Sequence, residues 1–527
     1  MAAPAAATLS IFHHLFASVA EEMGLTLERT AYSPNIKERL DFSCAVFLGD
    51  GRLLAQAAHI PVHLGAMPAS VRAAIEHVAP FAPGDVVILN DPYLGGTHLP
   101  DITLVSPVFA PGAEQPIFFV GSRAHHADVG GMAPGSMPRA TELYQEGLII
   151  PPSRLVDAGR RNEALWRLIL RNVRTPQERA GDLAAQLAAH IIGAARLEAI
   201  RRRYSLEGVL EQADVLIDYA QKLTAAALSR CPPGRYTFSD YLDDDGQGRD
   251  PVPLQVTLRI GADRLEADFS GSAPAVRGNL NAVPAIVHSA VAYCVRCVAL
   301  ALIGSHLPMN EGAFAPLSVV IPPGSILNPA PPHAVAAGNV ETSQRIVDVV
   351  FGALAQALPD LIPAASQGTM NNLSFGSMND GEEFAYYETI GGGAGAGPGA
   401  DGAGGIHVHM SNTRNTPVEA LEHAFPLRVE GYRLRAGSGG SGRYRGGDGL
   451  VRSLRFLAPV TATLTGERRR LQPYGLQGGH PGQSGSDWVE RDGKRQRLPG
   501  KVTLDLEAGD VLHIETPGGG GWGEPDE

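Results

Sequence analysis

The chain has 527 residues, of which 44% are apolar and 19% charged, so it has ample material for a buried core and is not a disordered chain. Its 43 Lys and Arg side chains against 55 Asp and Glu side chains give a net charge of −12, which argues against electrostatic binding to nucleic acid or to an anionic membrane. Four cysteines are too few for a disulfide framework, and no targeting segment is evident, so we expect a cytoplasmic protein.

The first part of the chain predicts helices around short strands. Apolar residues recur at helical spacing over 11–23 and predict a helix that Ser10 caps and Gly24 ends. Further along we predict two strands around the turn at Asp50-Gly51, a helix after Ser70, and strands at 85–89, 102–109 and 117–120.

A long helix is predicted from Thr175 to about Tyr204. Its start combines a capping Thr175, Pro176 at the first helical position and Glu178 three residues after the cap. Asp182 and Gln186 lie four residues apart on one face of this helix. If that face points outward, they are solvated residues, and if it points inward, they need partners.

The second half of the chain changes from helices to strands. Consecutive strands are predicted after residue 232, helices at 285–303 and 342–358, and short strands with glycine-rich turns over the last hundred residues. The stretch 391–405 is either a flexible linker or a packed glycine-rich loop. We therefore predict a mixed α/β (α+β) protein with mixed sheets, long helices and a β-rich C-terminal part. Its predicted regions are a metal-bearing 1–205, an α+β 206–430 and a β-rich 431–527.

Cys294 and Cys297 form a C-x-x-C pair inside an apolar, helical run. Without a second such pair or a nearby pair of histidines, packing is a better interpretation than metal binding or redox chemistry. The apolar run over 289–304 is interrupted by Arg296 and is short for a membrane span.

Two polar clusters follow predicted strands and contain the residues best suited to chemistry. The first holds His98 and Asp101, and the second holds His125, His126 and Asp128. Imidazole and carboxylate ligands together suit Zn²⁺, Mn²⁺ or Fe²⁺, and such an ion lowers the pKa of a bound water molecule. On residue types alone, a metal site and a hydrogen-bonded loop are about equally good interpretations.

Other polar residues near these clusters have structural alternatives. Asp91 can form an Asx turn before Pro92, and His63, between apolar residues, is more typical of a core histidine than of a ligand. Four glycines either let backbone N–H groups approach an anionic intermediate or simply form turns. They are Gly95, Gly96, Gly130 and Gly131. Neither a phosphate-binding G-x-x-x-x-G-K-[ST] loop nor a G-x-S-x-G or H-E-x-x-H motif is present.

Several long motifs resemble the hydantoinase B/oxoprolinase family, and they follow one another over essentially the whole chain. The most distinctive are ERTAYSPNIKERLDFSCAVF, HIPVHLGAMPASV, GDVVILNDPYLGGTHLPDITLVSPVF, RAHHADVGGMAPGSMP, DFSGSAPAVRGNLNA, HMSNTRNTPVEALE, RYRGGDGL and TPGGGGWGEP.

The resemblance implies a B-type subunit that works with a hydantoinase A-type, ATP-using partner. The partner, with Mg-ATP, would phosphorylate the amide oxygen of a small cyclic amide such as a hydantoin, 5-oxoproline or a lactam. The B-type subunit would then open the ring with a metal-activated water. A heteromer such as a dimer of heterodimers is implied. Alternatives are a subunit of an ATP-dependent ketone carboxylase and a non-catalytic subunit with a stabilising metal.

The resemblance also implies roles for individual residues. The implied ligands of one divalent ion (Zn, Mn or Fe) are Asp41, His98, Asp101 and His125. Glu38, His126 and Asp128 are the implied acid–base candidates, and Asp91 would orient His98. The glycines at 95, 96, 130 and 131 are expected near the intermediate.

Overall fold

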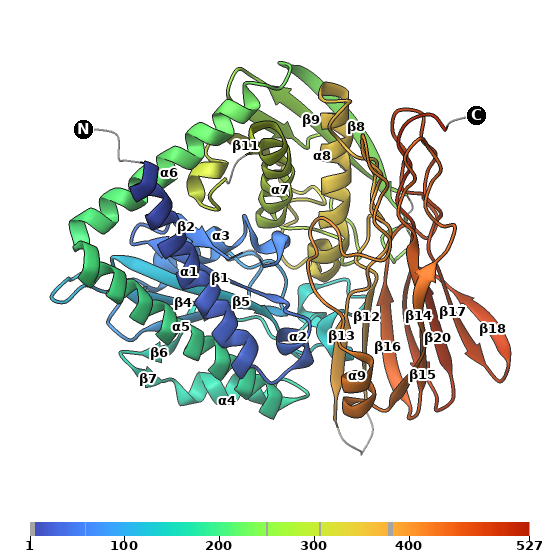
Figure 1. Cartoon of the computed structure of the whole chain (residues 1–527). Helices are drawn as coiled ribbons and strands as arrows, with labels where there is room; N and C mark the ends of the chain where they lie inside the picture. Colours follow the sequence, from blue (N-terminus) through green and yellow to red (C-terminus); the bar gives the residue numbers. More distant parts are fainter. Residues whose placement is uncertain (1–5, 58, 249–250, 305–306, 378–382, 526–527) are drawn as a thin grey trace.

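The computed structural model describes residues 6–57, 59–248, 251–304, 307–377 and 383–525. Its N-terminal part contains a seven-stranded antiparallel sheet in the order β2-β1-β5-β4-β3-β6-β7 (Figure 1). The strands are β1 (Phe42–Leu48), β2 (Leu53–Gln56), β3 (Val86–Leu89), β4 (Asp101–Val108), β5 (Phe118–His125), β6 (Ser153–Asp157) and β7 (Arg160–Arg161). The strands predicted on both sides of Asp50-Gly51 and the three that follow are confirmed.

Helices cover both faces of this sheet. α1 (Ala6–Thr30) and α5 (Pro176–Tyr204) pack together on one face, and α3 (Met67–Val78) packs on the other. α5 begins at Pro176 as predicted, although the Thr175 side chain makes no capping hydrogen bond. The short helices are α2 (Pro34–Lys37) and α4 (Glu163–Arg171).

The first helix is longer than predicted because Gly24 does not end it. Gly24 lies within α1 and is buried against His59, where a Cβ atom would come within 2.6 Å of the imidazole. The glycine therefore permits a close contact between the helix and the loop after β2 instead of terminating the helix.

The central part packs helices against a four-stranded sheet in the order β11-β10-β9-β8. Its elements are α6 (Leu206–Leu228), β8 (Gly234–Leu242), β9 (Val252–Ile260), β10 (Leu265–Asp268), α7 (Pro284–Ile303), β11 (Leu317–Val320) and α8 (Ser343–Ala357). A π-helical turn, Gly338–Thr342, leads directly into α8. The predicted helices at 285–303 and 342–358 are confirmed.

The strand-rich C-terminal part consists of two sheets that share one apolar core (Figure 1). One has the order β13-β12-β16-β19, and the other has the order β14-β15-β20-β17-β18. The elements are β12 (Asn372–Gly376), β13 (Ala385–Glu388), α9 (Val418–Ala424), β14 (Leu427–Arg435), β15 (Gly449–Phe456), β16 (Val460–Thr465), β17 (Ser486–Arg491), β18 (Lys494–Leu498), β19 (Lys501–Leu506) and β20 (Val511–Glu515). Because β12 pairs with β16, residues of the predicted central region contribute to this part.

The glycine-rich stretch 391–405 is a packed loop. Gly393 is buried, and a Cβ atom on it would lie 2.0 Å from the Gly447 carbonyl oxygen. Its backbone N–H donates to Pro517 O at 3.0 Å, so the loop is held against the C-terminal chain. Glycine is needed here because backbones approach too closely for any side chain.

Two helices, α5 and α7, are long and apolar enough to cross a membrane by length and composition alone. α7 has 20 residues, more than the short run that the sequence suggested. About half of each apolar window is buried inside the structure (44% and 56%), as in a core helix. Cys294 of α7 lies in the largest apolar core, as predicted for a packing residue.

Candidate metal centre

Three neighbouring strands, β1, β5 and β4, bring the predicted ligands together where these strands begin or end, at one end of the N-terminal sheet. Asp101, the first residue of β4, lies directly opposite His125, the last residue of β5, in the antiparallel register. Asp41 precedes β1, and its carbonyl oxygen accepts a hydrogen bond from the His125 N–H at 3.0 Å. His98 lies in the turn immediately before β4. Strand pairing therefore explains why residues 24 positions apart in sequence meet.

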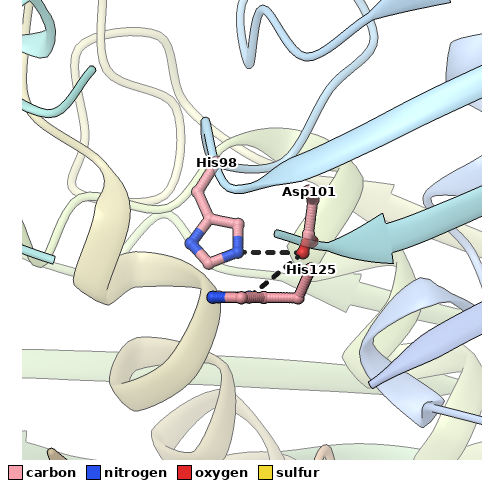
Figure 2. A group of neighbouring side chains, drawn as sticks. All are labelled: His98, Asp101 and His125. Atoms are coloured by element: carbon pink, nitrogen blue, oxygen red, sulfur yellow. Dashed lines mark ion pairs between the residues drawn. The ribbon is translucent and has the colours of Figure 1, made fainter. Parts of the chain in front are cut away.

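The Asp101 carboxylate lies at the centre of a cluster of imidazoles. Its Oδ1 atom is 3.1 Å from His98 Nε2 and 3.4 Å from His125 Nδ1 (Figure 2). Its Oδ2 atom is 3.3 Å from His63 Nε2 and accepts a hydrogen bond from Thr97 Oγ1 at 2.7 Å. His98, Asp101 and His125 each offer one potential ligand atom, and these three atoms lie within 4.8 Å of one another. All three residues are buried.

The hydrogen bonds of His98 show that its Nε2 atom is an acceptor and that it faces a second acceptor, Asp101 Oδ1. Nδ1 lies 3.2 Å from the Ala336 carbonyl oxygen, which can only accept, so Nδ1 carries the proton. The Nε2 lone pair lies 3.1 Å from Asp101 Oδ1 and 3.0 Å from the Asn339 amide nitrogen. Such an arrangement, with the outer imidazole nitrogen bonded to a carbonyl, is typical of a metal-binding histidine.

The distances and the donor types fit a divalent cation. Two ligand atoms that share an ion at about 2.1 Å lie about 3.0 to 3.4 Å apart at octahedral or tetrahedral angles. The contacts of Asp101 Oδ1 fall in this range. Asp101 Oδ1 is also buried without a hydrogen-bond partner in the part of the chain that the structure describes. A buried charge that lacks such a partner is costly unless an ion compensates it.

Charges within the cluster favour the protonation states that a cation needs. Burial alone would raise the pKa of Asp101, but His98, His63 and His125 outweigh it and hold that pKa well below its usual range. Burial lowers the pKa of His63 and of His125, although Asp101 opposes it in both cases. The ionised form of Asp101 and the neutral forms of His63 and His125 are therefore favoured near neutral pH.

The cluster borders a small cavity of about 20 Å³. This volume holds about one water-sized particle. The lining includes polar groups from distant parts of the chain and an apolar wall: Asp41, Ile60, Val62, His63, Asp101, His125, Asn339, Val340, Met370, Tyr387, Thr389, Met410, Ser411 and Thr413. The cavity fits an ion or a solvent molecule, but it is far too small for a cyclic amide.

Asp41 lines this cavity but lies outside the three-residue group that meets most closely. Burial raises its pKa, which His125 and Arg39 oppose. Its predicted role as a fourth ligand stays a prediction.

Three residues beside the cluster were not among the predicted site residues. His63, interpreted from sequence as a core histidine, contacts Asp101 through Nε2. Its Nδ1 atom is hydrogen-bonded to Ser43 Oγ at 2.8 Å. Asn339 Nδ2 lies 3.0 Å from His98 Nε2. The Tyr387 ring stacks on His125 with ring centroids 4.4 Å apart.

The predicted acid–base residues have other partners in the structure. His126 Nε2 lies 3.1 Å from Gln186 Oε1, so Gln186 of α5 faces inward. Asp128 accepts hydrogen bonds from the backbone N–H groups of Gly130 and Gly135 and pairs with Arg174 at 2.8 Å. Glu38 is half-buried at the end of α2. None of the three predicted residues lines the cavity, and their acid–base role stays a prediction.

Asp91 and the four predicted glycines lie in turns, and the predicted place of the glycines near an intermediate stays a prediction. Asp91 Oδ1 accepts a hydrogen bond from the Tyr93 N–H at 2.9 Å, which makes an Asx turn, while the Ala336 carbonyl accepts from His98. The predicted role of Asp91 in orienting His98 stays a prediction. The glycines lie outside the cavity lining; Gly95, Gly130 and Gly131 have positive φ angles, and the Gly96 N–H donates to Asp91 O.

Comparison with known proteins assigns the fold and the family. The hydantoinase B/oxoprolinase family model matches residues 5–525. The crystal structure of an ATP-dependent caprolactamase from Pseudomonas jessenii has a TM-score of 0.89 at 26% identity, covering 98% of this chain and 91% of that chain.

Sequence relatives differ in how much of their length this chain spans. 5-oxoprolinase 1 of Arabidopsis thaliana is 42% identical over 540 residues, which cover 98% of this chain and only 41% of that protein. A putative B-type subunit of a D-/L-hydantoinase from Pseudomonas sp. (strain NS671) is 31% identical over 525 residues, covering 96% of this chain and 88% of that protein. The chain belongs to the hydantoinase B/oxoprolinase family.

Proposed function

We propose that this chain provides the hydrolytic site of an ATP-dependent cyclic amide hydrolase that opens the ring with a metal-activated water. The observation that carries the proposal is the buried cluster of His98, Asp101 and His125 at the paired ends of β4 and β5. The similarity to an ATP-dependent caprolactamase and to 5-oxoprolinases supports a cyclic amide as the substrate class.

His98, Asp101 and His125 would bind the ion in a fixed geometry. His98 and His125 offer neutral nitrogen donors, and Asp101 offers a charged oxygen. When bound, a divalent cation would lower the pKa of a water molecule and so supply a nucleophile near neutral pH. Ala336 O holds the His98 tautomer, and stacking with Tyr387 fixes the plane of the His125 ring.

We also propose that an A-type partner uses ATP to activate the amide. Amide resonance makes the carbonyl carbon a poor electrophile, and phosphorylation of its oxygen would create a leaving group. The relative from Pseudomonas sp. is itself named as one subunit of a hydantoinase, which supports a partner subunit. Hydrolysis of the activated amide would then be the task of the cluster around Asp101.

The proposal is tested by combining the chain with its A-type partner, ATP and single cyclic amides (hydantoin, 5-oxoproline and caprolactam). We expect a ring-opened acid by mass spectrometry, with no requirement for bicarbonate. His98→Ala should abolish this product, while His423→Ala, an exposed change on α9, should not. A bicarbonate-dependent carboxylated ketone, or full turnover by His98→Ala, would contradict the proposal.

A further inference from the structure

A second, larger cavity lies against the metal centre and has the size of a small-molecule site. Its volume is about 550 Å³, within the range of about 300 to 1,000 Å³ typical of ligand pockets. Residues of α1, β2 and α7 form it, together with the loop after β2. Ile60, which is 4% exposed, lines both this cavity and the small cavity beside Asp101.

The wall between the two cavities consists of two short segments that are bonded to each other. In one, His59, Ile60 and Pro61 line the large cavity, and His63 lines the small one. In the other segment, Asn412 lines the large cavity, between neighbours that line the small one. Asn412 Nδ2 donates to His59 O at 3.0 Å. A single layer of residues therefore separates the large cavity from the metal centre.

The large cavity contains one guanidinium, that of Arg296, and one exposed carboxylate, that of Glu21 on α1. Arg296 donates through Nη1 to Leu307 O at 2.8 Å, and within the described chain it forms no ion pair, with Glu21 or with any other acidic residue. Burial lowers the pKa of Arg296, as expected where a charge is taken out of water without a compensating anion. Such an arginine is suited to a carboxylate or phosphate ligand.

A second polar group in this cavity has an atom without a partner. Gln56, the last residue of β2, is only 5% exposed, and its Oε1 atom has no hydrogen-bond partner within the described part of the chain. Because buried amide oxygens are normally paired, this acceptor indicates a missing donor such as an amide N–H. Much of the remaining lining is apolar, including Leu54, Leu64, Leu300 and Met309.

We propose that the large cavity binds the ring substrate, as a small, partly apolar cyclic amide that carries an anionic oxygen group. Arg296 would bind the anionic group, Gln56 Oε1 would accept from the amide N–H, and the aliphatic side chains would cover the ring carbons. The identity of the ligand rests on the proposed function, whereas the existence of the site rests on the cavity, the guanidinium without an ion pair and the amide oxygen without a donor.

The test measures binding of two matched probes to the purified chain by isothermal titration calorimetry. 5-Oxoproline is a five-membered ring amide with a carboxylate, and 2-pyrrolidone is the same ring without it. We expect 5-oxoproline to bind the wild-type chain, and Arg296→Gln to bind it about 10- to 100-fold more weakly. The much weaker binding of 2-pyrrolidone should be the same in both proteins.

Two further variants control for folding and for site. Arg264→Gln makes the same chemical change in a different cavity, beside β10 and β11, and should leave binding unchanged. Leu300→Trp fills the proposed cavity and should abolish binding even if Arg296→Gln does not fold. Equal binding of 5-oxoproline to the wild-type chain, Arg296→Gln and Leu300→Trp, or no millimolar binding to the wild-type chain, would overturn the inference.

The same samples separate this inference from the proposed function. If His98→Ala binds 5-oxoproline normally but no cyclic amide is ever hydrolysed, the proposed function fails while the ligand site stands. If hydrolysis depends on His98 but the probe binds without regard to Arg296, the ligand site fails alone.

Discussion

Replacement of Asp101 by Asn distinguishes a metal centre from a merely structural carboxylate. The substitution keeps the size of the side chain and removes its charge, so the hydrogen bond from Thr97 can be retained. If Asp101 binds an ion together with His98 and His125, its loss should weaken metal binding by at least about 100-fold, because even outer-shell changes cost about 10- to 100-fold. The metal-free protein should lose only about 1 kcal/mol of stability, the value of one altered hydrogen bond.

A structural carboxylate paired with protonated histidines predicts a different result. Breaking such a buried pair costs about 3–5 kcal/mol of unfolding free energy and changes no metal content. The low pKa of Asp101 would then contribute stability above the pKa of an unfolded Asp, about 3.9, and this stability would be lost as pH falls. In Asp101→Asn, the free energy of unfolding would then decrease less as the pH falls.

Elemental analysis after dialysis and urea unfolding in the presence of a chelator measure both quantities. Asp91→Asn is the matched control, because it makes the same change in an Asx turn outside the cavity. Full metal content with wild-type affinity in Asp101→Asn would refute the reasoning.

Three further predictions concern stability. Burial raises the pKa of Glu146 from 4.5 to about 8, so between these pH values the folded chain retains a proton that the unfolded chain releases. The free energy of unfolding should therefore fall as pH rises from 4.5 to 8, and in urea titrations Glu146→Gln should reduce this fall by a few kcal/mol. Parallel curves of stability against pH for the two proteins would contradict this. Gly393→Ala should cost about 1–3 kcal/mol because its Cβ atom would lie 2.0 Å from a carbonyl oxygen, while Gly397→Ala, with 3.6 Å of clearance, serves as its control in thermal unfolding. Glu388→Gln should cost about 3–5 kcal/mol because it leaves the buried Arg452, 3.1 Å away, without its anion; an unchanged melting temperature would refute this.

Local sequence patterns predicted the parts of the site that strand pairing determines. His98 and Asp101 precede one strand and His125 ends the next, so pairing of neighbouring strands in an antiparallel sheet is enough to bring them together. The same local signals located α5 and the strands on both sides of the turn at Asp50-Gly51.

Other contacts of the site depend on tertiary packing that local patterns do not contain. His63 reaches Asp101 from the 3-10 turn Pro61–His63 after β2, and its apolar sequence neighbours fit a core residue equally well. Asn339 comes from a π-helical turn 241 positions beyond His98, in another part of the fold. Gly24 shows the opposite error, since a local stop signal was overridden by the packing of α1 on the loop at His59.

The sizes of the two cavities constrain how a ring could reach the ion. About 20 Å³ beside Asp101 admits one solvent molecule, whereas a five- to seven-membered ring needs a space such as the 550 Å³ cavity across the wall. The wall at Ile60 must therefore move, or the ring must enter only partly, before a water held near Asp101 can attack it. In the proposed reaction, this wall would limit the access of bulk water to an ion beside Asp101 until the activated amide arrives, so that the activated amide would meet only the water held there.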